Sequence, residues 1–231
     1  NFSLLDTDEP AVAAVAAVRS GRAKMLMKGQ IATPALMRAV LDSVSGLRTD
    51  RVVCQIPLVE LRPSERRFLM ADTGICIQPS VRQKLNILTS AVNLAQALGA
   101  ETPRVALMAA SETVKESMPE TLEAAEIARR AAAGELPGCP VQGPLSFDLA
   151  FAAEASEKKQ ISGPVAGAAD VMLFPNLLSA NLTIKAIMYT ADCRFGGVLC
   201  GAQCPVVFMS RADTTATRLN SLALAARLVA G

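Results

Sequence analysis

The feature that most constrains the fold is a regular alternation of short apolar runs with longer segments of helical periodicity. In the segment 79–98, Val81, Leu85, Leu88 and Val92 follow one another at spacings of four, three and four residues, as expected for one face of a helix. The next run, 105–109, is apolar throughout and has the length of a buried strand. Such alternation is typical of α/β proteins, in which helices cover the faces of a sheet.

The same pattern predicts the remaining elements. Strands are expected at 23–27, 52–60, 66–71, 105–109, 139–141, 171–174, 198–200 and 206–209. Helices are expected at 11–19, 34–44, 79–98, 119–133, 144–154, 178–188 and 214–229. The turn-like residues 62–65 separate the second and third strands, so we expect an antiparallel hairpin there.

The composition argues against several classes of partner. The net charge is only +2, so no basic face is expected for nucleic acid, and seven Phe and one Tyr leave few rings for base stacking. No apolar run reaches the roughly 18 to 20 residues of a membrane span, and no signal-peptide pattern opens the chain. We therefore expect a cytoplasmic protein with no nucleic-acid partner and no membrane partner.

The chain has no histidine and six cysteines, which restricts its chemistry. Because histidine is the commonest metal ligand and a frequent general base, catalysis would have to use carboxylate, lysine, cysteine or hydroxyl groups, or electrostatics alone. Only Cys200 and Cys204 are close in sequence, and no histidine could complete a zinc site. We interpret the cysteines as buried free thiols, and we expect no metal.

The most informative local motif is Ser210-Arg211-Ala212-Asp213, which follows the apolar run 206–209 and precedes a helical pattern. A strand end that meets a helix N-terminus is a favourable place for an anion, and the fork of Arg211 can hold two phosphate oxygens. Asp213 could accept a proton from a thiol or hydroxyl. The alternative is that Asp213 caps the last helix and that Arg211 is a solvated charge.

A similar arrangement occurs near the start of the chain, where Lys28 and Gly29 follow the run 23–27. We expect Thr33 to be the N-cap of the following helix, with Pro34 at its first position. Lys28 and the first amides of that helix could hold an anion, and Arg38 lies one turn inside. The alternative is a solvated lysine. The sequence has neither a P-loop nor a dinucleotide fingerprint.

A third polar segment follows the run 171–174. Asn176 comes at the end of this strand, and Asn181 and Lys185 are four residues apart on one face of the next helix. Ligands of open α/β sheets bind beyond the carboxyl ends of strands, where these groups would project. The alternative is an ordinary surface pair of asparagine and lysine.

Taken in order along the whole chain, these segments resemble the phosphate acetyl/butyryltransferase family. The matching stretches are 24–29, 47–49, 68–72, 118–122, 143–148, 165–167, 174–176, 181–185, 189–192 and 210–213. The Met-Lys-Gly sequence that ends at Gly29 and the single tyrosine, Tyr189, resemble the phosphate butyryltransferase branch more than typical phosphotransacetylases.

The resemblance implies transfer of an acetyl or butyryl group, in which acyl-CoA and phosphate give acyl phosphate and CoA. Coenzyme A is then a substrate, and no cofactor is tightly bound. The implied fold has two α/β domains with a cleft between them, similar to the isocitrate/isopropylmalate dehydrogenase-like fold. We expect residues 1–48 and 207–231 to form the first domain and residues 49–206 the second. We also expect a homodimer, and a chain that lacks N-terminal strand–helix units of the family.

The resemblance also implies roles for residues. Ser210 and Arg211 would hold the phosphoryl group, and Arg38 resembles a second family arginine. The family's thiol-activating aspartate falls at Ala216 and Thr217, so Asp213 is our choice for the base. Relatives often carry histidine where this chain has Gln55. The expected substrate-binding residues are Lys28, Gly29, Thr33, Arg38, Asn176, Asn181 and Lys185.

Two other functions compete with this one. The first is a non-catalytic domain that keeps the fold within a longer protein, and the replacement of the family histidine by Gln55 favours it. The second is a metal-dependent dehydrogenase of related fold, although such sites usually need clustered carboxylates or histidines, which the sequence does not provide.

Overall fold

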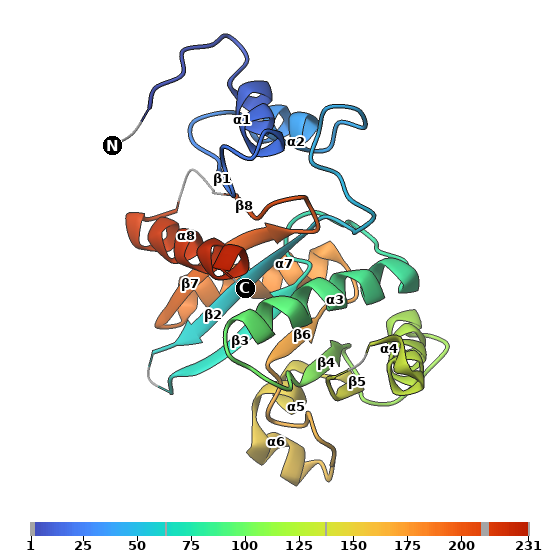
Figure 1. The fold of residues 1–231 in the computed structure, drawn as a ribbon. Helices are drawn as coiled ribbons and strands as arrows, with labels where there is room; N and C mark the ends of the chain where they lie inside the picture. Colours follow the sequence, from blue (N-terminus) through green and yellow to red (C-terminus); the bar gives the residue numbers. More distant parts are fainter. Residues whose placement is uncertain (1–2, 63, 137, 209–212, 231) are drawn as a thin grey trace.

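The computed structural model describes residues 3–62, 64–136, 138–208 and 213–230. Within these residues, eight strands form one mixed sheet in the order β1-β8-β7-β2-β3-β6-β4-β5 (Figure 1). The strands are β1 (Leu26–Met27), β2 (Cys54–Leu61), β3 (Arg66–Ala71), β4 (Val105–Met108), β5 (Val141–Leu145), β6 (Val171–Leu173), β7 (Cys193–Cys200) and β8 (Val206–Val207). The helices are α1 (Pro10–Arg19), α2 (Thr33–Val40), α3 (Val81–Ala97), α4 (Pro119–Arg130), α5 (Phe147–Phe151), α6 (Ala153–Lys158), α7 (Leu177–Thr190) and α8 (Thr215–Ala230), and a π-helical turn (Ala131–Glu135) follows α4.

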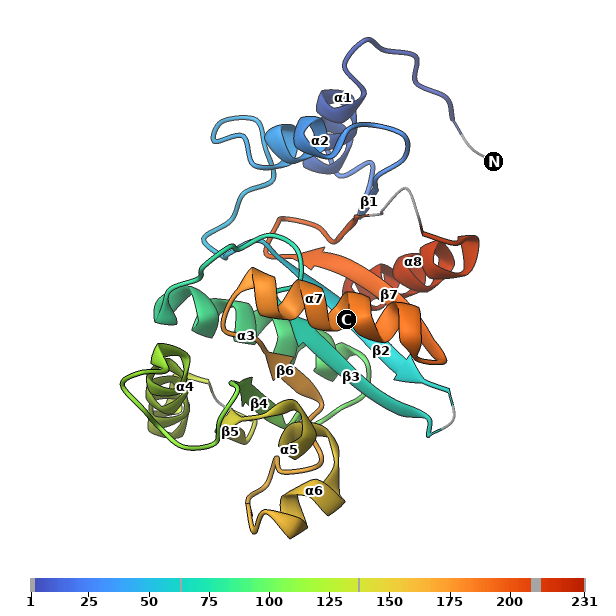
Figure 2. The same ribbon diagram turned by 180° about the vertical axis from the view of Figure 1, so that it is seen from behind.

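Helices cover both faces of the sheet because alternate side chains of each strand point to opposite faces. On β3, Leu69 and Ala71 face the core under α3, α4 and α8, whereas Phe68 and Met70 face the core under α5 and α7. Figures 1 and 2 show α3 and α8 on one side of the strands and α7 on the other. The α/β class predicted from the alternating pattern is therefore confirmed.

The segment before β2 forms a smaller unit at one end of the sheet. α1 and α2 pack over a third cluster of buried residues that includes Leu26 of β1, Leu199 of β7 and Val206 of β8. β1 pairs in parallel with β8, so the start and the end of the chain meet in adjacent strands. The described residues form one continuous sheet, and the division into two domains stays a prediction.

The expected hairpin is confirmed. β2 and β3 are antiparallel, with Leu61 opposite Arg66 at the turn. β2 also pairs with β7 over its full length, from Cys54 opposite Cys200 to Leu61 opposite Cys193. β7 meets β8 at a single position, Leu199 opposite Val206. In the described part of the chain, residues 193–198 pair with β2 on one side and with no strand on the other, and this stretch of β7 positions the site described below.

Several predicted boundaries were wrong. The first strand begins at Leu26 rather than at residue 23. The helix expected at 144–154 is replaced by β5, which extends to Leu145, and by the short helices α5 and α6. Thr33 is the first residue of α2 and not its N-cap; the cap position is Ala32, whose side chain can accept no hydrogen bond.

In the part of the chain that the structure describes, no helix is long and apolar enough to span a bilayer.

Candidate active site

Four of the predicted site residues line one cavity of about 200 Å3, which we call the site cavity. Thr33, Asn181, Lys185 and Asp213 come from α2, from α7 and from the segment before α8, and they are far apart in sequence. The remaining lining residues are Gln55, Thr73, Ile184, Met188, Phe195, Gly197, Phe208 and Ser221. The polar residues expected at strand ends are therefore partly brought together by the fold.

Asp72 organises one wall of the site cavity. Its side chain is buried, and its carboxylate accepts four backbone N–H groups. Oδ1 accepts from Gln55 at 3.0 Å, from Gly74 at 2.9 Å and from Ile75 at 3.2 Å, while Oδ2 accepts from Cys76 at 2.7 Å. A buried carboxylate requires such compensation. These bonds fix the loop after β3 and thereby the position of Thr73.

α7 supplies the opposite wall. Asn176 is its N-cap, and its side-chain oxygen accepts the backbone N–H of Ser179 at 3.0 Å. One turn later, Asn181 donates from Nδ2 to the Thr73 carbonyl at 3.0 Å, which ties the helix to the loop after β3. Lys185 is exposed and adds a positive charge to the lining. The predicted placement of Asn181 and Lys185 at a common site is thus supported by geometry, and Asn176 has a capping role.

The third wall is built where β8 leads into α8. Thr214 caps α8, since its Oγ1 accepts the N–H of Thr217 at 3.2 Å. The interpretation of Asp213 as the helix cap was therefore wrong, and Asp213 lines the site cavity half-buried. Ser210 and Arg211 lie outside the described residues. The nearest described residues on either side of them, Phe208 and Asp213, both line the site cavity.

Three other predicted residues lie outside the lining of the site cavity. Lys28 is only 6% exposed, and its Nζ donates to the Gly29 carbonyl at 3.3 Å, so the alternative of a solvated lysine was wrong. Gly29 is exposed at the surface, and Arg38 is exposed on α2.

The sequence reasoning missed several lining residues. Thr73 lies at the carboxyl end of β3, the kind of position used for the other predictions, and the strand-end rule could have found it. Ser221 lies in the middle of α8, where its Oγ accepts the N–H of Gly197 at 3.0 Å and donates to the Thr217 carbonyl at 2.8 Å. Nothing in the helical pattern distinguishes Ser221 from any other buried small residue.

The cavity suits an anionic substrate with several oxygen atoms. Lys185 provides a cation, Gln55 and Asn181 carry amide groups, and Asp213 is a carboxylate that could accept a proton. No cysteine lines the site cavity. Burial raises the pKa of all six thiols, to about 12 for Cys76 and Cys200 and to about 11 for Cys204. Among the described residues, no group of three or more cysteine or carboxylate side chains could hold a metal ion.

Comparisons with known proteins agree on one family. Residues 5–226 match the family described as phosphate acetyl/butaryl transferase. The chain is 40% identical to the phosphate butyryltransferase of Clostridium acetobutylicum, over 96% of this chain and 73% of that protein. It is 38% identical to the phosphate acetyltransferase of Thermotoga maritima, over 92% of this chain and 72% of that protein.

Solved structures give the same result. The chain is similar to a branched-chain phosphotransacylase from Enterococcus faecalis, with a TM-score of 0.88 and 32% identity over 99% of this chain and 86% of that one. A 4-hydroxythreonine-4-phosphate dehydrogenase from Klebsiella pneumoniae has a TM-score of 0.57 at 14% identity, over 95% of this chain and 69% of that one. The second likeness concerns the fold alone.

Proposed function

Because the chain belongs to the phosphate acetyl/butaryl transferase family, we propose that it is an acyltransferase that moves an acetyl or butyryl group between coenzyme A and inorganic phosphate. The reaction is acyl-CoA plus phosphate giving acyl phosphate plus CoA. The observation that carries this proposal is the site cavity, in which Thr33, Asn181, Lys185 and Asp213 meet from distant segments. Its one lysine and its amides are the groups that a phosphate or an oxyanion requires.

The proposed mechanism is direct transfer. In the direction of acyl-CoA synthesis, the thiolate of CoA attacks the carbonyl carbon of the acyl phosphate, a carbon–sulfur bond forms, and the carbon–oxygen bond to phosphate breaks. A thiol with a pKa of about 8.5 must first lose its proton, and we assign Asp213 as the acceptor. Arg211 and Ser210 would hold the phosphoryl group, while Lys185 and Asn181 would face the developing negative charge.

The state of the cysteines supports direct transfer over an acyl-cysteine intermediate. A covalent route needs a cysteine that is a thiolate near neutral pH and that touches the substrate. Burial instead raises the pKa of each thiol of this chain. No cysteine lies in the wall of the site cavity.

Other parts of the proposal concern the surroundings of the site. We retain residues 1–48 with 207–231 as one domain and residues 49–206 as the other, with the substrate between Thr33 and Asn181. The core cluster under α1 and α2 contains Val15, Leu36 and Val40 of the first range, together with Leu199 and Val206 of the second. Lys28, Gly29, Arg38 and Asn176 would then be supporting residues rather than direct ligands.

A homodimer and a cytoplasmic location complete the proposal. Light scattering of the purified chain tests whether it is a homodimer.

The decisive experiment measures CoA release from acetyl-CoA and from butyryl-CoA in the presence of phosphate. We expect turnover with at least one substrate, a fall of about 10²–10³-fold for Arg211→Gln, and a comparable or larger fall for Asp213→Asn. Lys158→Gln is a matched control, because Lys158 is an exposed lysine of α6 that pairs with Glu154 away from the site cavity. Unchanged turnover in Arg211→Gln would contradict the site assignment. The absence of any turnover would favour the non-catalytic alternative.

A further inference from the structure

A second cavity of about 410 Å3 continues from the site cavity along β7. The two cavities share Met188, Phe195 and Asp213. Together they form what we call the β7 trough. Its floor is formed by β7 through Cys193, Arg194, Phe195 and Gly197. The walls are formed by α7, through Lys185 and Met188, and by α8, through Thr217 and Asn220. At about 3.4 Å per residue, the floor from Gly197 to Cys193 is about 14 Å long.

The floor of the trough is fixed by hydrogen bonds from α8. Asn220 donates from Nδ2 to the Phe195 carbonyl at 3.1 Å, and the Ser221 hydroxyl accepts the Gly197 N–H at 3.0 Å. Within the described residues, β8 pairs with β7 at Leu199, and these two side chains satisfy backbone groups of β7 beyond that position. In the described part of the chain, this stretch of β7 therefore forms the floor of a groove between α7 and α8.

The two ends of the trough differ in chemistry. The site cavity at one end contains Lys185, and Asp213 lies where the two cavities join. The far end is lined by two arginines, Arg62 and Arg194, and by the ring of Tyr189, which is 76% exposed. The far end is therefore suited to a ligand with several negative charges and a flat ring, and the near end to the reacting atoms.

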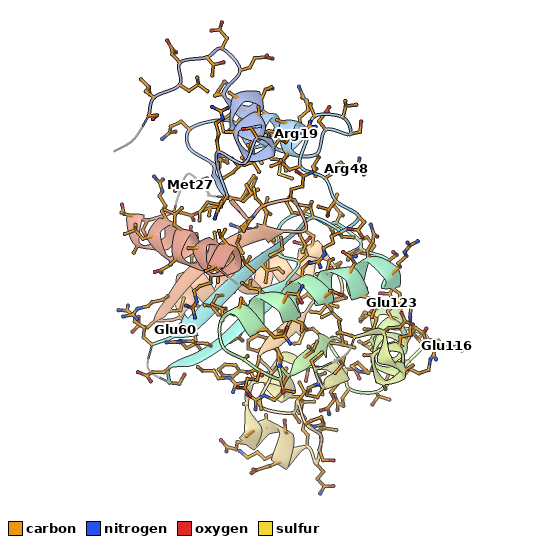
Figure 3. All side chains as sticks on the ribbon, in the orientation of Figure 1. Arg19, Met27, Arg48, Glu60, Glu116 and Glu123 are labelled. Atoms are coloured by element: carbon orange, nitrogen blue, oxygen red, sulfur yellow. The ribbon has the colours of Figure 1, made fainter. Side chains whose placement is uncertain are left out.

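Arg62 and Arg194 are each held by an ion pair that leaves some of their N–H donors available to a ligand. Arg62 pairs with Asp192, and Arg194 Nη1 lies 3.2 Å from Glu60 Oε1, near the free end of the β2–β3 hairpin (Figure 3). Both arginine side chains are more than half exposed. Exposed ion pairs contribute little stability, and a guanidinium has five N–H donors, so one carboxylate leaves donors for a phosphate.

We propose that the far end of the β7 trough binds the nucleotide of coenzyme A, with Arg62 and Arg194 contacting its phosphates and Tyr189 stacking on its adenine. The inference rests on the proposed function. Coenzyme A has its thiol at one end of a flexible arm and its phosphates and adenine at the other. A nucleotide at Arg62 and Arg194 directs the arm along the floor of β7, so that the thiol reaches Asp213.

The test compares butyryl-CoA with butyryl-pantetheine, which carries the same thioester without the nucleotide. For Arg62→Ala and Arg194→Ala, we expect KM for butyryl-CoA to rise about tenfold, as for loss of a charge-assisted hydrogen bond. KM for butyryl-pantetheine and KM for phosphate should not change. Tyr189→Ala should raise KM for butyryl-CoA about three- to tenfold, and Tyr189→Phe should restore it, because stacking needs only the ring.

Arg67→Ala is the matched control. Arg67 Nε lies 2.5 Å from Glu60 Oε2, so Arg67 shares an ion-pair network with Arg194, yet it is not part of the trough lining. We expect Arg67→Ala to leave KM for butyryl-CoA unchanged. Equal changes in KM for butyryl-CoA and butyryl-pantetheine in both arginine variants would overturn the proposal.

Failure of the nucleotide site and failure of the proposed function give different results. If the wild-type chain turns over neither substrate, the proposed function fails, and calorimetric titration with CoA and with pantetheine then tests the trough directly. Binding of CoA about tenfold or more tighter than pantetheine, lost in Arg62→Ala, would support the nucleotide site. Equal affinities, or no measurable binding of CoA, would contradict it.

Discussion

The Gln55 side chain occupies the space beside Gly74 that a larger residue at position 74 would need. A Cβ on Gly74 would lie 1.8 Å from Gln55 Oε1 and 2.9 Å from its Cδ. The glycine thus sets the conformation of a side chain in the wall of the site cavity. The backbone N–H of Gln55 is also held by Asp72 Oδ1, so both the main chain and the side chain of Gln55 are constrained by the loop after β3.

Gly74→Ala should therefore displace the Gln55 amide into the site cavity. We expect kcat/KM for acyl transfer to fall about tenfold or more. The free energy of unfolding should fall by only about 0.5–1.5 kcal/mol, as for a side chain forced away from its rotamer, because the clashing atoms are the end of the flexible Gln55 side chain. Steady-state kinetics and urea denaturation measure the two effects. The double variant Gly74→Ala/Gln55→Ala is the control, since it removes the clashing atoms. A double variant as unstable as Gly74→Ala alone would show that the clash is not the cause.

Asp72→Asn should destabilise the chain and loosen the same loop. The amide NH2 of asparagine would face backbone donors that the carboxylate now accepts, and it would leave at least one of them unsatisfied. We expect the free energy of unfolding to fall by about 1–3 kcal/mol in urea denaturation. Asp42→Asn is the comparison, because Asp42 also accepts N–H groups, from Val44 and Ser45, but is exposed. An equal loss in both variants would argue against burial as the cause.

Lys84 on α3 is only 2% exposed and pairs with Glu123 on α4. Figure 3 labels Glu123 beside one end of α3. Glu123→Gln leaves the buried ammonium without its counter-charge, so we expect the free energy of unfolding to fall by about 1–3 kcal/mol. Lys84→Met should cost less, because the remaining carboxylate is about a third exposed and can be hydrated.

The control for this pair lies on the same helix. Glu126 pairs with Arg129, and both side chains are well exposed, so Glu126→Gln should change the urea midpoint much less than Glu123→Gln. If Lys84→Met lowers the free energy of unfolding more than Glu123→Gln does, an unpaired buried ammonium is not the cause of the destabilisation.

The cysteines should resist alkylation in the folded chain. Burial raises the pKa to about 12 for Cys76 and Cys200 and to about 11 for Cys204, so almost none of these thiols is ionised at pH 8. We expect iodoacetamide at pH 8 to leave these three residues unmodified in the native protein and to modify them in urea, as read by peptide mass spectrometry. Rapid native labelling of Cys200 would contradict the burial on which this expectation rests.

Most of the fold could be predicted because the helices and strands differ in length as well as in periodicity. The segment 79–98 has both a helical pattern and a capping box formed by Ser80 and Gln83, and α3 falls within one or two residues of the prediction. β1 and β8 are shorter than predicted, because strand length depends on which partner is available, and the sequence does not contain that information.

Four of the predicted site residues lie together in the structure, and their positions in the sequence explain why. Thr33 begins α2 and Asp213 precedes α8, while Asn181 and Lys185 share one face of α7, and these four residues line one cavity. Lys28 follows β1 and Arg38 lies in the last turn of α2, yet neither lines the site cavity, because the position of a residue along an element does not fix the direction of its side chain. Ser221 and Phe195 belong to the site through tertiary contact alone.

The pairing of β1 with β8 sets an order for folding during synthesis. Leu26 lies beside Val206 and Met27 beside Val207, so β1 gains this partner only after residues 28–205 have been made. Until then, the buried cluster under α1 and α2 lacks Leu199, Cys204 and Val206. Thr33 and Asp213 consequently cannot meet in a nascent chain, and an interrupted translation product would have no working site.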